Sequence, residues 1–287
     1  MKLQSLGLLV SLLICWPGSA KEQVTVYVSH IPPFNILYGE TRGSGQIDVA
    51  IQQVRDALAD SFQFQLREAP FSRFFNDARA GKAICHFTLR RTPEREQFLD
   101  FSPAHTYSFG NGLIVSEGKL AALSPYLNDN GQIDLGQAME QGGLKLFVER
   151  GRIYSPVIDQ LLAEASNTRG RVTTYSKQYQ LESKIQLLRH PNLLGLIGYP
   201  SEVFYHNQVQ DPEDRIAYLE VQGSRYPTSG HLACSKGEWN DSFMQAAQQE
   251  LQQLSRSPEY YELQYQWLPD NLHSSYQDLI DEQLQLD

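Results

Sequence analysis

Strand-like and helix-length segments alternate along most of this chain, and that alternation is the feature that most limits how it can fold. In the first third, runs of β-branched or alternating apolar residues predict strands at residues 24–29, 62–66 and 82–86. Apolar residues at helical spacing predict helices between them, at 47–58 and 71–80. Strand–helix–strand order of this kind produces a mostly parallel sheet with helices on its faces.

A second unit with the same order begins past the middle of the chain. Its predicted strands are residues 144–148, 172–175 and 193–197, and its predicted helices are 154–165, 177–188 and one that starts at 201–206. A polar stretch at 124–131 has loop composition and separates the two units. The chain ends with a predicted strand at 230–235, helices at 239–255 and 258–267, and a polar tail. We therefore expect an α/β protein with two helix-flanked sheets.

The first twenty residues have the pattern of a cleavable secretory signal peptide. Lys2 provides a positive charge, residues 6–16 form a short apolar run, and small residues precede a cleavage site after Ala20. A lipoprotein interpretation through Cys15 is disfavoured, because the bulky Ile14 stands where a small residue is wanted. No later run reaches the length of about 18 apolar residues that a membrane span needs. The pattern therefore predicts export to the periplasm.

The charge balance argues against two classes of partner. The chain has 33 acidic and 24 basic residues, for a net charge of −9. Such an acidic chain without basic clusters is poorly suited to nucleic acid or to an anionic membrane surface. We expect neither as a partner, but the charge selects no particular partner among those that remain.

Two cysteines, Cys85 and Cys234, remain after the predicted signal peptide. In an oxidising exported compartment an isolated pair is a disulfide candidate. Two buried thiols that never meet are the alternative. The bridge would close a very long loop, which requires a fold that brings distant segments together.

Candidate ligand-binding residues follow the predicted strands, because open α/β sheets bind ligands beyond the carboxyl ends of their strands. After the first strand, Pro32 and Pro33 stiffen a loop in which Phe34 either forms a ligand wall or simply packs. After the third strand, residues 88–95 hold two threonines and three arginines. Guanidinium groups suit a carboxylate or a phosphate, although a solvated basic loop is the alternative.

Three motifs in order resemble one known family. The motifs are PPF at 32–34, DARAGK at 77–82 and TLRRTPEREQFLDFSP at 88–103. Together they resemble the periplasmic solute-binding proteins of the polar amino-acid type, family 3. The likeness is weaker over 144–199, where LFVERG resembles the strand that enters the second lobe, and it returns at 230–236.

The resemblance implies a two-lobed periplasmic-binding-protein (type II) fold whose first lobe is discontinuous. Each lobe would be a mostly parallel sheet flanked by helices, with two hinge crossings near residues 113–116 and 228–231. The implied divisions are a signal peptide at 1–20, lobe 1 at 21–115, lobe 2 at 116–227 and lobe 1 again at 228–287. Both cysteines would then lie in the first lobe, close enough to bridge.

The resemblance also implies roles for residues of the ligand site. Arg95 matches the arginine that clamps a ligand carboxylate, Phe34 matches an aromatic residue beside the ligand, and Thr88 and Arg90 stand where small hydroxyl residues flank it. Gly151 and Arg152 match a Gly-Thr pair at a helix start, a position suited to an anion.

Two departures from the family pattern bear on the ligand. Tyr199 stands where a carboxylate usually holds the ligand's ammonium group, and Arg90 and Arg152 replace small polar residues. A buried ammonium without a charge partner is costly, so these changes favour an acidic ligand over an ordinary α-amino acid. Glu202 takes the ammonium role if the helix start is shifted.

The predicted function is binding of a small polar ligand for an inner-membrane permease or a sensor kinase, by a monomer without cofactor or metal. The enzyme alternative is an exported dehydratase that acts on a cyclic carboxylate. Its acid or base would come from a set of titratable residues: His30, His86, Glu94 and Glu202. A metal site at His30, His86 and His105 is disfavoured because no ligand-type spacing occurs.

Overall fold

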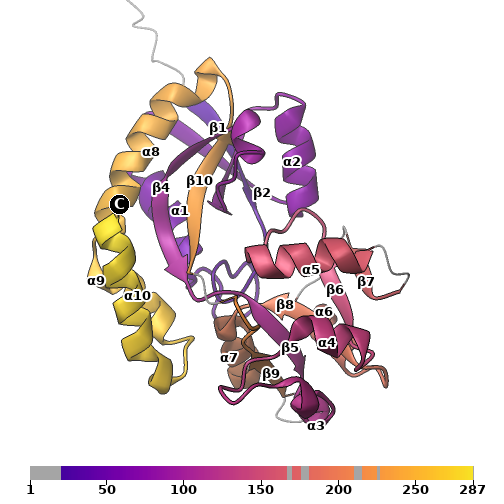
Figure 1. Cartoon of the computed structure of the whole chain (residues 1–287). Coiled ribbons are helices and arrows are strands. Elements are labelled where there is room, and N and C mark those ends of the chain that lie inside the picture. The colour runs from indigo at the N-terminus through magenta and orange to yellow at the C-terminus, as the bar shows by residue number, and fades with distance from the viewer. Residues whose placement is uncertain (1–20, 167–169, 176–180, 210–214, 225–226, 287) are drawn as a thin grey trace, which may run out of the picture.

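The computed structural model of the chain describes residues 21–166, 170–175, 181–209, 215–224 and 227–286. The predicted signal peptide at 1–20 lies outside these residues. The described chain forms two five-stranded sheets, which Figure 1 shows one above the other, each with helices around it. We call the elements around the first sheet the first lobe and those around the second sheet the second lobe.

The first sheet has the strand order β2-β1-β3-β10-β4. Its strands are β1 (Glu22–Val28), β2 (Phe62–Glu68), β3 (Ile84–Leu89), β4 (Leu99–Ser108) and β10 (Thr228–Ser235). Strand β1 pairs in parallel with β2 and β3, whereas β10 is antiparallel to both β3 and β4. The strand that returns from the second lobe is therefore inserted into the first sheet beside its third strand.

Alternating side chains explain how the first sheet is covered on both faces. Val24, Val26 and Val28 enter one core, while Tyr27 enters the core on the opposite face. Helices α1 (Gln46–Ala57), α8 (Asp241–Leu254), α9 (Pro258–Tyr265) and α10 (His273–Leu286) contribute to the first core, and α2 (Phe71–Arg79) covers the other.

The second sheet repeats this plan with the order β7-β6-β8-β5-β9. Its strands are β5 (Gly112–Ser116), β6 (Lys145–Glu149), β7 (Val172–Tyr175), β8 (Leu194–Gly198) and β9 (Ile216–Leu219). Its helices are α3 (Leu120–Leu123), α4 (Leu135–Glu140), α5 (Pro156–Ser166), α6 (Leu181–Leu188) and α7 (Pro200–Val209). Strand β5, like β10, is the antiparallel strand in the fourth position.

The chain passes between the sheets between β4 and β5 and again between β9 and β10. A lobe boundary after residue 115 would divide β5, which pairs with β8 and β9 over Gly112–Ser116. We therefore place the first crossing at 109–111. The lobes also touch away from the crossings, where Ile36 and Trp267 of the first lobe join a core cluster with Tyr205 of α7.

The predicted disulfide is present and joins Cys85 to Cys234 across β3 and β10. The two residues are 149 positions apart in the chain but directly paired in the sheet. The bridge is therefore internal to the first lobe, where it ties the returning strand to the segment that precedes both crossings.

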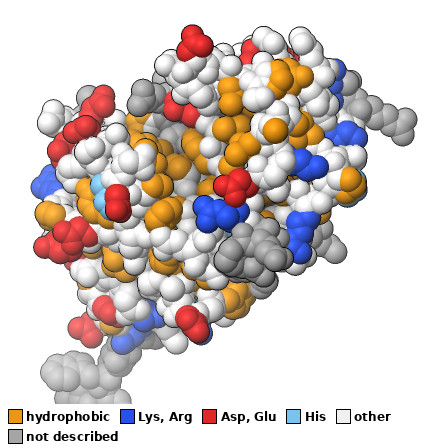
Figure 2. All heavy atoms as spheres, turned by 90° about the horizontal axis from the view of Figure 1, so that it is seen from below, with side chains coloured by type: hydrophobic (Ala, Val, Ile, Leu, Met, Phe, Trp, Pro, Cys, Tyr) orange, Lys and Arg blue, Asp and Glu red, His pale blue; other side chains and the backbone are white. Residues whose placement is uncertain are grey.

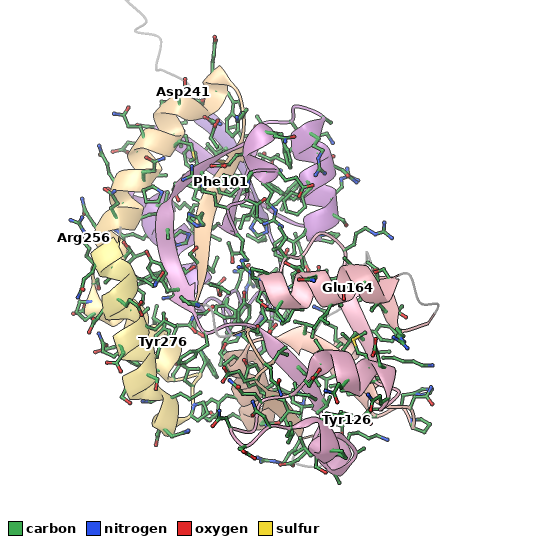
Figure 3. All side chains as sticks on the ribbon, in the orientation of Figure 1. Phe101, Tyr126, Glu164, Asp241, Arg256 and Tyr276 are labelled. Atoms are coloured by element: carbon green, nitrogen blue, oxygen red, sulfur yellow. A yellow bond between two sulfur atoms is a disulfide. The ribbon has the colours of Figure 1, made fainter. Side chains whose placement is uncertain are left out.

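Several elements were not predicted from the sequence: β4, β9, α3, α4 and α10. Strand β4 contains Pro103, a residue that argues against a central strand; β4 pairs only with β10 among the described strands, and an edge strand tolerates proline. The expected polar tail contains helix α10, which buries Tyr276 and Ile280. The Tyr276 hydroxyl, labelled in Figure 3, donates to the carbonyl of Tyr107 at 3.0 Å.

The surface carries both signs of charge. Figure 2 shows acidic and basic side chains on the face seen from below, with hydrophobic side chains between them. Within the described part of the chain, every helix is too short or too polar to cross a membrane.

Candidate functional site

A cavity lies between the two lobes and is lined from both of them. Its volume is about 70 Å³. All six predicted binding residues line it, together with the alternative ammonium partner: Phe34, Thr88, Arg90, Arg95, Arg152, Tyr199 and Glu202. The fold therefore gathers into one place residues that are spread over about 170 positions of the chain. Their roles toward a ligand stay predictions.

Phe34 reaches the cavity because its loop is tightly held. The Pro32–Pro33 bond is cis, and Phe34 donates from its backbone to the carbonyl of Ile31 at 2.9 Å. The Asp48 carboxylate, at the start of α1, accepts the backbone N–H of Ile36 at 2.7 Å. The Phe34 ring meets the Tyr199 ring edge-on across the lobes, with centroids 5.1 Å apart. The two rings form an aromatic side of the cavity.

Arg90 and Arg95 extend from the first lobe to the second. The Arg95 guanidinium donates to the carbonyl of Arg90 at 2.7 Å and to that of Gly151 at 2.8 Å, and it lies 4.6 Å from the Phe75 ring centre. Arg90 donates to the carbonyls of Ile153 and Tyr154. Both arginines therefore connect the lobes through backbone oxygens.

Arg95 is a buried cation with no carboxylate of the described residues within ion-pair distance. Its residue is 7 % exposed, and no ion pair within 4.0 Å joins it to an acidic group in the described residues. Burial, followed by the nearby positive charge of Arg90, lowers the pKa of Arg95 to about 10, and the more distant carboxylates of Glu94 and Asp159 oppose this shift only in part. The guanidinium stays charged at neutral pH, so an anion in the cavity would compensate its charge further.

The second-lobe side of the cavity carries a matched ion pair. Arg152 lies 3.6 Å from the Glu202 carboxylate, which also accepts the backbone N–H of Tyr199 at 2.6 Å. The Arg152 guanidinium is 5.5 Å from the Tyr154 ring centre and 5.4 Å from that of Tyr199. Burial by itself lowers the pKa of Arg152, but interactions with Glu202, followed by those with Tyr154, Tyr199 and Glu149, together outweigh burial and raise that pKa above its ordinary value.

A second ion pair lies behind this one. Lys184 of α6 is 3.8 Å from the carboxylate of Glu149, and both residues are buried. Burial lowers the pKa of Lys184, and Glu149 opposes that shift. The second lobe therefore balances its buried charges internally, whereas Arg90 and Arg95 of the first lobe are held by carbonyl oxygens.

Strands β4 and β10 contribute polar residues that the sequence did not reveal. They are Thr106, Tyr107, Ser108, Thr228, Ser229 and Gly230. A Cβ atom on Gly230 would lie 2.3 Å from the Thr106 hydroxyl, so the close approach of these strands requires glycine. These residues could have been found from the sequence if β4 had been recognised as a strand, because β4 places its hydroxyl side chains beside those of β10.

The titratable residues considered for catalysis or metal binding are mostly elsewhere. His86 stacks on Phe71, and His105 bonds to the carbonyl of Phe87 at 2.8 Å inside the core. Of the proposed acids and bases, Glu202 alone lines the cavity. Among the residues with described positions, no group of three or more His, Cys, Asp or Glu side chains is arranged to hold a metal ion.

A two-lobed α/β fold with a polar cavity between its lobes defines a class of small-ligand-binding proteins. The sequence model of the bacterial extracellular solute-binding proteins, family 3, matches residues 24–270. The chain belongs to this family, as its motifs had predicted. A comparison with curated proteins gives no match.

Solved structures share the fold at low sequence identity. A substrate-binding protein of an amino acid ABC transporter from Streptococcus pneumoniae, bound to L-arginine, is 16 % identical; the match covers 86 % of this chain and 94 % of that one, with a TM-score of 0.60. A Salmonella typhimurium periplasmic binding protein with high arginine specificity is 15 % identical, covering 87 % and 100 %, with a TM-score of 0.59. A histidine kinase sensor domain similar to periplasmic binding proteins is 12 % identical, covering 86 % and 96 %, with a TM-score of 0.61. Two of these neighbours are binding proteins and the third is a sensor domain, and the likeness at these identities is one of fold.

Proposed function

We propose that this chain is an exported receptor that closes its two lobes around a small acidic solute. The observation that carries the proposal is Arg95, a buried cation at the interlobe cavity with no carboxylate partner among the described residues. Its planar guanidinium can hold a carboxylate through two parallel hydrogen bonds. Arg90 adds a second positive charge to the same side of the cavity.

The size of the cavity favours a short ligand. Its volume of about 70 Å³ is less than half that of the cavity of about 150 Å³ known to accept a benzene ring. A larger solute would have to displace the bonds from Arg90 and Arg95 to the second lobe. Closure on a ligand is a hinge motion, and a ligand drives it by binding the closed form more tightly than the open form.

The proposed context is the periplasm, reached through the signal peptide at 1–20. There a monomer would present its bound ligand to an inner-membrane permease or to a sensor kinase. Similarity to both a transporter binding protein and a kinase sensor domain supports these two partners without choosing between them.

Thermal unfolding in the presence of candidate ligands tests this function. A panel of short mono- and dicarboxylates, phosphates, amino acids and sugars should contain an acid that raises the melting temperature, since a ligand that binds only the folded state stabilises it. Arg95→Gln should abolish that shift. Arg91→Gln is the matched control, because Arg91 is exposed, pairs with Glu96 and does not line the cavity. An acid that stabilises Arg95→Gln as strongly as the wild type would refute the proposal.

A further inference from the structure

The cavity contains one carboxylate among its described lining residues, Glu202, and that carboxylate is already engaged. One of its oxygens accepts the backbone N–H of Tyr199 at 2.6 Å and lies 3.6 Å from the guanidinium of Arg152. Glu202 is therefore matched by a cation from the protein itself.

Arg152 is held firmly in this place. Its side chain is 14 % exposed and that of Glu202 is 7 % exposed, so solvent screens the pair weakly. The rings of Tyr154 and Tyr199 lie within 5.5 Å of the guanidinium, a distance at which cation–π attraction adds to the ion pair. Glu149, the next buried carboxylate on this side, faces Lys184 at 3.8 Å.

A ligand with an ammonium group would meet no unmatched carboxylate in this cavity. It would have to displace Arg152 from Glu202, which leaves one buried cation unpaired, or stay unpaired itself. A carboxylic acid without an amino group has no ammonium to leave unpaired and does not displace Arg152. Its carboxylate can still interact with Arg90 and Arg95.

We infer that Arg152 is a specificity-determining residue that takes the place of a ligand's cationic group, so that the cavity selects short carboxylic acids without an amino group over the corresponding amino acids. The inference rests on the proposed function, because it names the class of acid that the receptor binds. Specificity then arises from a charge built into the site that repels the wrong ligand.

Matched ligand pairs that differ in the amino group test the inference. Calorimetric titration of the wild type with propionate against L-alanine, and with succinate against L-aspartate, should show at least about tenfold tighter binding of the amine-free acid in the pair that binds. That factor is what one charged hydrogen bond typically contributes.

Variants of the ion pair then assign the preference to Arg152. Arg152→Gln should shift the ratio toward the amino acid by about tenfold or more, because Glu202 becomes free to accept an ammonium group. Arg152→Lys keeps the charge and should keep the preference. The double variant Arg152→Gln/Glu202→Gln should not show this increase in relative affinity for the amino acid, because the carboxylate that would accept the ammonium group is also gone. Arg150→Gln removes the same charge from an exposed neighbour outside the cavity and should change nothing.

Melting curves establish which variants fold, and Arg152→Met is a second neutral replacement if the glutamine variant does not. The inference is wrong if the wild type binds the amino acid of a pair as tightly as its partner, or if neutral variants leave the ratio unchanged. If amino acids bind and Arg95→Gln abolishes their binding, the proposed function stands and only the role of Arg152 falls. If no acid binds the wild type, both fail.

Discussion

The two sides of the cavity come from lobes with the same strand plan but opposite charge arrangements. On the first-lobe side, the side chains of Arg90 and Arg95 donate hydrogen bonds to carbonyl oxygens, and neither forms an ion pair within 4.0 Å among the described residues. On the second-lobe side, Arg152 is paired with Glu202, and Lys184 behind it is paired with Glu149. Under the proposed function, this difference means that the attraction for an anionic ligand would come from the first lobe, while the second lobe would supply a side whose charges are already paired.

The lobes also differ in how they are held together. The first lobe is discontinuous in sequence and carries the Cys85–Cys234 bridge between β3 and β10. The second lobe is one continuous segment between the two crossings, and both cysteines beyond residue 20 lie outside it. A crosslink serves the lobe whose parts would otherwise separate, because it limits the freedom of the unfolded chain over a long loop.

The largest expected effect comes from removal of this crosslink. The double variant Cys85→Ala/Cys234→Ala should lower the free energy of unfolding by about 4 kcal/mol, as expected for a bridge that closes a long loop. Denaturant titration measures the change. A reductant should destabilise the wild type similarly and leave the double variant unaffected, and equal stability of the two proteins would contradict a structural role for the bridge.

Removal of a charge from the ion pair of the second lobe should lower the free energy of unfolding more than removal of a charge from the first lobe. Glu202→Gln leaves the Arg152 cation buried and unpaired, so the free energy of unfolding should fall by about 3 kcal/mol. Arg95→Gln should cost less, because it also removes the repulsion between Arg95 and Arg90. Denaturant titration of both variants at one pH makes the comparison. A greater loss for Arg95→Gln would overturn the contrast between the two sides.

Acid should weaken the first lobe through its buried histidines. Burial lowers the pKa of His86 and of His105 to about 3, whereas histidines of an unfolded chain titrate near 6.5. Below that pH the unfolded chain binds more protons than the folded one. The contribution of the two neutral histidines to the free energy of unfolding is therefore complete above about pH 6.5 and is lost as the pH falls toward 3. At pH 5 the loss is about 2 kcal/mol for each histidine.

Unfolding measured from pH 7 to pH 5 tests this, with His86→Phe as the variant. Phenylalanine suits the site because the His86 ring already packs against two aromatic rings, at a shallow tilt to Phe71 and edge-on to Phe74. The slope of stability against pH should become shallower in this variant. His190→Gln, at an exposed position of the second lobe, should leave the slope as it is. An unchanged slope in His86→Phe would show that the acid sensitivity arises elsewhere.

The smallest effect is expected from a steric change beside the second-lobe ion pair. A Cβ atom on Gly198 would lie 2.4 Å from the Glu202 carboxylate and 2.6 Å from Ile114. Gly198→Ala should therefore lower the free energy of unfolding by about 1–2 kcal/mol through crowding. Gly118→Ala is the control, because a Cβ atom there meets nothing within 4 Å. Equal melting temperatures for the two variants would show that Glu202 moves aside without cost.

Much of the fold could be predicted from local patterns. The spacing of apolar residues identified β1 and α1, for example, because a strand buries every second side chain and a helix buries every third or fourth. Strand β4 escaped prediction because its proline is tolerated only at a sheet edge, and edge position is a property of the whole sheet. Helix α10 escaped because a few buried residues such as Tyr276 anchor an otherwise polar segment.

The candidate site, like the fold, could be predicted only in part from the sequence. By itself, the sequence placed Phe34 and Arg95 after predicted strands of the first unit, whose ends meet at one edge of a sheet, whereas Arg152 was assigned to the site only through the resemblance to the family. Only the tertiary structure decided that Glu202 pairs with Arg152, while no carboxylate of the described chain lies within 4.0 Å of the Arg95 guanidinium. The physical reason is distance: charges interact over a few ångströms, and Arg152 and Glu202 are 50 positions apart in the sequence, which says nothing about their separation until the second lobe is folded.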